Sequence, residues 1–134
     1  MSQVRKGARP PESSPMDPRQ LARLADLLSA ADTALSSLNL AGADSSRRRF
    51  DIADSAFTRA YWIFERERFT PPAVRAAAAS LRSALLDARS GQIQGEIAAT
   101  RGVELSPDIQ ERWTRANERA RALRAELEGH LTPG

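Results

Sequence analysis

The sequence predicts an all-α protein, an antiparallel up-down four-helix bundle that follows a disordered N-terminal tail. The first observation is composition, because 24 of the 134 residues are alanine and only four phenylalanines, two tryptophans and one tyrosine are present. Alanine is the best helix former, whereas sheets favour β-branched and aromatic residues. The second observation is that apolar residues recur in four segments at alternating steps of three and four. This spacing is typical of helices that pack in a bundle.

Length, charge and cysteine content narrow the class of protein. A chain of 134 residues fits one domain. The absence of cysteine excludes disulfides and thiolate metal sites. No apolar run reaches the length of a membrane span, so we expect a cytoplasmic protein. Lys6 is the only lysine among 20 basic residues, a bias typical of a GC-rich bacterial or phage genome. We therefore do not interpret the net charge of +3 as a sign of nucleic-acid binding.

The chain divides into a tail and a bundle. Residues 1–16 contain three prolines and three serines without hydrophobic periodicity, so they are predicted to be disordered. Residues 17–130 are predicted to form the bundle. Because alanine dominates the apolar positions, the core is expected to be thin, and self-association as a homodimer is expected to supplement it.

The first helix is predicted over residues 18–41. Asp17 is a good N-cap, and Gln20 lies where a capping box places its second residue. The apolar seam of this helix consists of Leu21, Leu24, Leu28, Ala31, Leu35 and Leu38. The second helix is predicted over residues 45–69, since Pro71 disfavours helical geometry at Thr70. Its seam consists of Phe50, Ala53, Phe57, Ala60 and Phe64, widened by Ile52, Ala56 and Ile63.

The third helix is predicted over residues 71–101, with Thr70 as its cap. Its seam consists of Val74, Ala77, Leu81, Ala84, Ala88, Gly91, Gly95 and Ala98. A glycine inside a helix costs about 1 kcal/mol relative to alanine. We therefore expect either a bulky neighbour packed against this small-residue stripe or a break near Gly91.

The fourth helix is predicted over residues 107–129, capped by Ser106 and ended by Gly129. Its seam consists of Ile109, Trp113, Ala116, Ala120, Leu123 and Leu127. The short connections between the four segments favour antiparallel neighbours. The tight link at Thr70 leaves a wide angle between the second and third helices as an alternative.

Candidate chemical sites are few. Asp51 and Asp54 lie one helical turn apart, but an arginine four positions before Asp51 favours a surface ion pair over acid–base catalysis. His130 is the only histidine, and with Glu126 it offers two ligands where a metal site needs more. No phosphate-binding loop or nucleophile motif is present. We predict no catalytic residue, no metal site and no cofactor, and hence no enzymatic activity.

One short motif points to a nuclease class. Arg124 and His130 have the R-x5-H spacing found in ribonucleases of the HEPN class, which are helical bundles of about this length. The chain departs from that motif at Ala125, where a polar residue is usual, and at Gly129, which ends the helix before the histidine. The resemblance makes an HEPN-like ribonuclease the third function considered, and no residue role is taken from it.

Two arginine clusters suggest contacts with anions. Arg47, Arg48 and Arg49 lie in the first turn of the second helix, where cations oppose the helix dipole. They are the candidate phosphate-binding residues for a nucleic-acid-associated subunit. Arg112, Arg115 and Arg119 share one face of the fourth helix, and interspersed glutamates favour an exposed lattice of ion pairs there.

The most informative feature is the outer side of the second helix. At about 100° per residue, Trp62 lies about 160° from the phenylalanine seam. The same side carries Phe69, Arg48, Arg59 and Arg66. Aromatic residues interleaved with arginines are typical of protein interfaces and of surfaces that stack single-stranded bases. The alternative is that this helix is central and covered on both sides, or that Phe69 packs on Val74.

These observations favour a non-enzymatic protein–protein interaction module. It would associate with itself or bind a partner protein through Trp62, Phe69, Arg59, Arg66 and Arg48. The alternative is a nucleic-acid-associated helical subunit that binds the phosphate backbone through its arginines.

Overall fold

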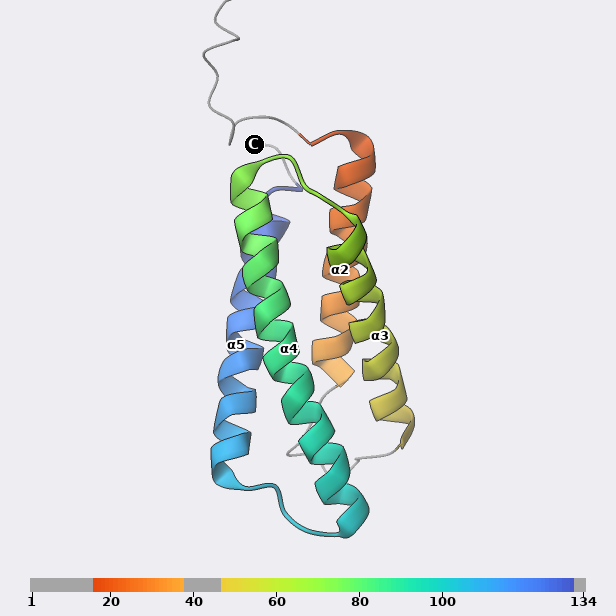
Figure 1. Cartoon of the computed structure of the whole chain (residues 1–134), viewed down its shortest axis with the longest axis vertical. Helices are drawn as coiled ribbons and strands as arrows, with labels where there is room; N and C mark the ends of the chain where they lie inside the picture. The colour runs from red at the N-terminus through yellow and green to blue at the C-terminus, as the bar shows by residue number, and fades with distance from the viewer. Residues whose placement is uncertain (1–15, 38–46, 132–134) are drawn as a thin grey trace, which may run out of the picture.

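The computed structural model describes residues 16–37 and 47–131, apart from the side chains of residues 47–49. These ranges contain four helices and no strand: α2 (Pro18–Ser37), α3 (Arg47–Arg66), α4 (Pro72–Arg101) and α5 (Pro107–Glu128). Successive helices run in opposite directions and lie side by side, so the up-down four-helix bundle is confirmed (Figure 1). Residues 1–15 of the predicted tail lie outside the described residues, whereas Met16, the last residue assigned to that tail, packs against the core.

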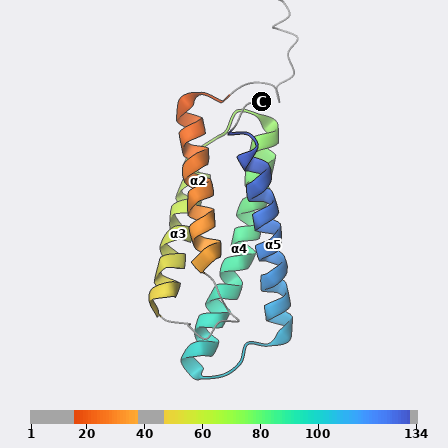
Figure 2. The ribbon, with the colours of Figure 1, turned by 180° about the vertical axis from the view of Figure 1, so that it is seen from behind.

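The bundle consists of two helical hairpins. Contacts are most extensive between α2 and α3 and between α4 and α5, whereas α3 and α4 share fewer contacts, as do α2 and α5. Figure 2 shows α2 and α5 on the face opposite the one seen in Figure 1. The wide-angle alternative for α3 and α4 is therefore wrong.

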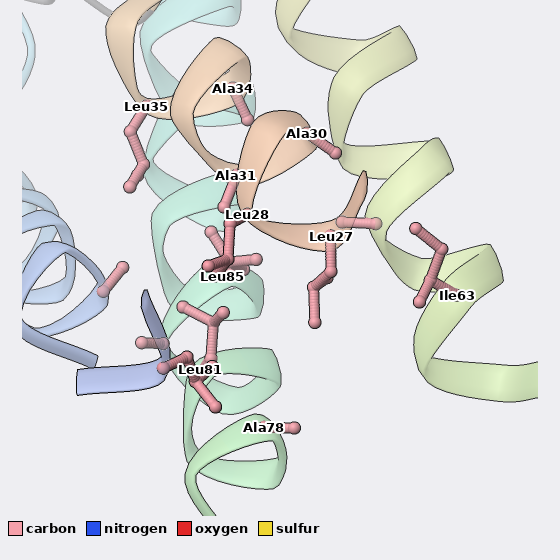
Figure 3. Close-up of a cluster of buried hydrophobic side chains, with 14 of the residues drawn as sticks. Leu27, Leu28, Ala30, Ala31, Ala34, Leu35, Ile63, Ala78, Leu81 and Leu85 are labelled. Atoms are coloured by element: carbon pink, nitrogen blue, oxygen red, sulfur yellow. The ribbon is translucent and has the colours of Figure 1, made fainter. Parts of the chain in front are cut away.

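The core is built from leucine and alanine on the facing sides of the helices. The predicted seam of α4 is buried along its whole length, from Val74 to Ala98. In α2 the buried side is wider than predicted and also includes Leu27, Ala30 and Ala34. Figure 3 shows labelled side chains of α2, α3 and α4 converging in one cluster. The prediction for Ile52 was wrong, because this side chain is exposed.

The helix boundaries follow the predictions with two instructive differences. The predicted end of the first helix and start of the second, within residues 38–46, lie outside the described residues. Helix α3 ends at Arg66 instead of residue 69. Helix α4 starts at Pro72 with Pro71 as its N-cap, so Thr70 is not the cap. The physical reason is that Pro72 disfavours helical geometry at Pro71, whose ψ of 127° is extended.

The turn between α3 and α4 is fastened to the start of α2. Glu67, which is buried, accepts two hydrogen bonds from the Arg19 guanidinium at 2.8 and 3.1 Å. The Gln20 side-chain oxygen accepts bonds from the Thr70 N–H and hydroxyl. Gln20 therefore does not complete a capping box, although its N–H donates to the Asp17 carboxylate as expected for an N-cap. Contacts between residues that are 48 and 50 positions apart in the sequence thus close this end of the bundle.

Removal of the Arg19 guanidinium is expected to destabilise the fold. Arg19→Ala would leave the Glu67 carboxylate without its charged partner in a site where its side chain is 4% exposed. Because Arg19 is itself 66% exposed, the expected loss is about 1–2 kcal/mol, less than for a fully buried pair. Urea denaturation measures it. Arg115→Ala is the matched control, since that arginine and its partner Glu111 are both exposed. Equal losses in the two variants would contradict the account.

The stripe of small residues on α4 is explained by a bulky neighbour, and α4 is continuous through Gly91. A Cβ added at Gly91 would come within 2.8 Å of Cβ and Cγ of Trp113 on α5, and closer to its Cδ1. The indole therefore lies against the glycine backbone. The predicted break near Gly91 is wrong, and the alternative of a packed neighbour is confirmed.

Helix ends elsewhere follow their caps. Gly102 ends α4 with a φ of 69°, and its N–H bonds back to the last turn of the helix. Ser106 caps α5 by accepting a bond from the Ile109 N–H at 3.3 Å. Both positions were identified from the sequence.

Candidate interaction surface

One side of α3 is buried in the bundle, and the opposite, outer side is exposed. Phe57 and Ala60 are fully buried, whereas Ser55, Arg59 and Trp62 are exposed. The helix is therefore amphipathic with one covered face, and the alternative that it is covered on both sides is wrong.

Trp62 is the central side chain of this surface. It is 48% exposed, as its position opposite the phenylalanine seam predicts. The Arg66 guanidinium carbon lies 4.4 Å from the centroid of the indole ring, within the range of a cation–π contact. Arg66, four positions along α3, thus covers part of the ring and fixes its position.

A second guanidinium comes from another helix. The guanidinium carbon of Arg23 on α2 lies 5.9 Å from the Trp62 ring centroid, and this arginine also approaches Asp26 at 3.9 Å. With exposed Arg59, these residues form what we call the Trp62 surface: Arg23, Arg59, Trp62 and Arg66. No pattern within the second helix could have revealed Arg23, because the contact depends on how α2 and α3 pack.

Phe69 does not belong to the Trp62 surface. It is 3% exposed and lies in the hydrophobic core with Val74, so its prediction as a partner-binding residue was wrong. The reason is that α3 ends at Arg66, after which the backbone leaves the helical direction. An angular position extrapolated along α3 therefore does not apply to residue 69.

The arginine run at the start of α3 is only partly described. Arg47, Arg48 and Arg49 belong to the helix, but their side chains lie outside the described set. The predicted roles of Arg48 in partner binding and of all three in phosphate binding therefore stay predictions.

Between α3 and α4 the charged groups are paired. Arg89 lies 3.9 Å from Asp54 and 6.0 Å from the ring centroids of Phe57 and Tyr61. Burial raises the pKa of the Tyr61 phenol above its ordinary value of 10.0, and the nearby charge of Arg89 partly opposes this effect. Asp54 thus takes part in an ion pair across helices, as a structural carboxylate does.

A groove of about 360 Å³ lies between α4 and α5. Its arginines are Arg112, Arg115 and Arg119, and Gly91 and Trp113 also line it. The predicted ion pairing holds for Arg115, which contacts Glu111 at 2.7 Å. The groove brings positive charge beside an indole, and the carboxylate of Asp87 also lines it.

No metal centre is found among the residues that the structure describes. No group of three or more acidic, histidine or cysteine side chains there could hold an ion. His130 lies in the turn after α5, beyond the end of the helix that carries Glu126. These two residues therefore do not share a continuous helix, as a two-ligand pair at that spacing would require.

The arginine of the R-x5-H motif is held by carboxylates. Arg124 contacts Asp32 of α2 at 2.7 Å and Glu128 at 2.6 Å. His130, the other motif residue, lies in the turn that follows Glu128. The guanidinium of Arg124 thus has a structural role in joining α5 to α2.

Comparison with known proteins gave no matching family model, no matching curated protein and no matching solved structure. None of the helices within residues 16–37 and 47–131 combines the length and hydropathy that a membrane crossing requires.

Proposed function

We propose that this chain is a non-enzymatic interaction module that binds another protein through the Trp62 surface. The observation that carries the proposal is the 48% exposure of Trp62 between two guanidinium groups. Tryptophan and arginine are the residues most enriched among the energetic anchors of protein interfaces. An exposed indole that is already held in place loses little conformational freedom when a partner covers it.

The charges of the surface indicate the chemistry of the partner. Arg59 and Arg66 are exposed, and Arg23 lies 3.9 Å from the Asp26 carboxylate, at the margin of an ion pair. A complementary partner would present carboxylates around an apolar recess that accepts the indole. We propose that this partner is another protein, because self-association is assigned below to a separate surface on α4.

Nucleic acid is the second candidate, supported by the same arginines and indole. Two features favour a protein. Arg66 occupies part of the ring on which a base would stack. Acidic groups at Asp26 and Asp51 lie on the exposed sides of α2 and α3, and they weaken the attraction for a phosphate backbone.

Photo-crosslinking identifies what covers this surface. A photoreactive phenylalanine at Thr58, which is exposed and one turn before Trp62, is introduced into the full chain in the cells that produce it. The expected product is a covalent adduct with a second polypeptide, lost in a Trp62→Ala background and kept with Ile52→Ala, an exposed apolar control on the same helix.

The nucleic-acid candidate has its own outcome in the same design. Adducts to nucleic acid, together with oligonucleotide binding that weakens steeply with salt, would contradict the protein-binding proposal. An adduct that persists in Trp62→Ala would also contradict it, because the crosslinked polypeptide would then not depend on the indole.

A further inference from the structure

Helix α4 has a second stripe at heptad spacing on the side that faces solvent. We call it the outer seam; its members are Ala76, Ala79, Ser83, Leu86, Ser90, Ile93, Ile97 and Thr100. Successive members are separated by alternating steps of three and four, and all of them are exposed. None carries a charge, although the outer face of a bundle helix normally consists of charged and polar residues.

The outer seam lies nearly opposite the buried seam of the same helix. Its members follow the buried ones by two positions, as Leu86 follows Ala84, and two positions are about 200° around a helix. Leu86, Ile93 and Ile97 are 48%, 43% and 42% exposed. Three branched apolar side chains in one line on a free surface indicate an interface.

We infer that the outer seam packs against the outer seam of a second copy of this chain, with the two α4 helices antiparallel. The inference extends the proposed function, because it assigns self-association to α4 and leaves the Trp62 surface on α3 free for another partner. The occupant is a second copy because the two halves of the seam differ in size in a complementary way.

Size complementarity favours the antiparallel arrangement. The first half of the seam is small apart from Leu86, and the second half contains the large Ile93 and Ile97 but begins with the small Ser90. With the two-fold axis near residue 88, Ile97 faces Ala79 of the second copy, Ile93 faces Ser83, and Leu86 faces Ser90. Every one of these layers then combines one large and one small side chain, so the helices can keep one spacing along the pair. A parallel pair would place large against large and small against small.

The charges that flank the outer seam are compatible with this register. Near the two-fold axis Arg89 would approach its own copy, but its guanidinium is directed to Asp54 and to two aromatic rings of α3. Asp87, on the other flank, lies in the groove with three arginines of α5. Farther from the axis, Arg82, whose guanidinium lies 3.1 Å from Glu65 of α3, comes opposite Glu96 of the second copy, so that no like charges face each other there.

Light scattering on the full chain tests the inference. The chain is measured over a range of concentrations up to about 0.5 mM. At the highest concentrations the expected mass is that of a dimer, and the dimer should dissociate on dilution. Ile93→Glu, at an exposed site, is expected to give a monomer with an unchanged helical spectrum. Ile52→Glu is the matched control and should remain dimeric. A wild-type monomer across that range, or an Ile93→Glu dimer, would overturn the inference.

Cysteine crosslinking tests the direction of pairing, and the chain has no cysteine of its own. In the antiparallel register, position 90 is offset from its own copy by about 6 Å along the axis, whereas position 83 is offset by about 15 Å. A disulfide needs Cα atoms within about 7 Å, so a short bismaleimide is used as the crosslinker. It should join Ser90→Cys to its own copy and should not join Ser83→Cys. Efficient crosslinking of both variants would show a parallel pair and overturn the register.

The two proposals can fail separately. A dimer that dissociates in Trp62→Ala but persists in Ile93→Glu would overturn the α4 inference and leave the Trp62 surface as an interface. A dimer that dissociates in Ile93→Glu, while crosslinking from Thr58 gives no polypeptide, would support the α4 inference and contradict the proposed function.

Discussion

Phe69→Ala is expected to lower the free energy of unfolding by about 3–5 kcal/mol, the range for truncation of a buried aromatic side chain. Phe69 is 3% exposed and belongs to the same buried cluster as Val74. It follows the end of α3 in the turn that Arg19 and Gln20 fasten to α2. Its loss would leave a cavity, and the hydrogen bonds that fasten the turn to α2 limit how far the site can collapse.

Trp62→Ala is the natural comparison for Phe69→Ala, because the sequence placed both aromatics on one side of a helix. Trp62 is half-exposed, so its truncation should cost no more than about 1 kcal/mol, mostly from the lost contact with Arg66. Urea denaturation of the two variants gives both values. Similar losses of unfolding free energy in the two variants would mean either that Phe69 is not in the core or that Trp62 is in the core.

Gly91→Ala is expected to destabilise the fold by about 1–3 kcal/mol, although alanine is the better helix former. The added methyl group would overlap the Trp113 indole, whose Cβ and Cγ would lie at 2.8 Å. The indole joins α5 to α4 at this point and cannot move away without losing its packing on the α4 backbone.

The sign of this effect should reverse when the indole is absent. In a Trp113→Ala background, Gly91→Ala should stabilise the chain by about 1 kcal/mol, the intrinsic difference between the two residues in a helix. A thermodynamic cycle of the four proteins isolates the contact. Stabilisation by Gly91→Ala in the wild-type background would show that Trp113 does not pack on this glycine.

The sequence contained enough information for the architecture. Heptad spacing identifies the side of each helix that packs inward, because the side chains of a helix recur every 3.6 residues whatever they contact. Caps such as Asp17 and Ser106 act within four residues of their own position. Both are local properties, and they were confirmed except for Ile52, which is exposed, and Thr70, which does not cap α4.

Other predictions failed where contacts between distant residues decide the local structure. The end of α3 depends on Glu67 and Thr70, whose partners Arg19 and Gln20 lie about fifty positions earlier. The approach of Arg23 to Trp62 likewise depends on the packing of α2 on α3. No pattern confined to a single helix contains this information.

The outer seam of α4 shows a different limit. Its residues have the same spacing in the sequence as those of the buried seam, and Leu86 is the same residue type as Leu81 and Leu85. Only the packing of the four helices shows that Leu81 is covered and Leu86 is not. Once the covered side is known, the second stripe is identified as an exposed helix face without charges, which is unusual for a bundle helix.

The most direct test of the central claim is the affinity of the chain for the polypeptide that crosslinks at the Trp62 surface. Isothermal titration with the wild-type chain, Trp62→Ala and the control Ile52→Ala gives three dissociation constants. If Trp62 anchors the interface, Trp62→Ala should bind about 30-fold more weakly, a loss of about 2 kcal/mol, while Ile52→Ala binds as the wild type does. Equal dissociation constants for all three chains would contradict the claim that this surface is where the protein binds its partner.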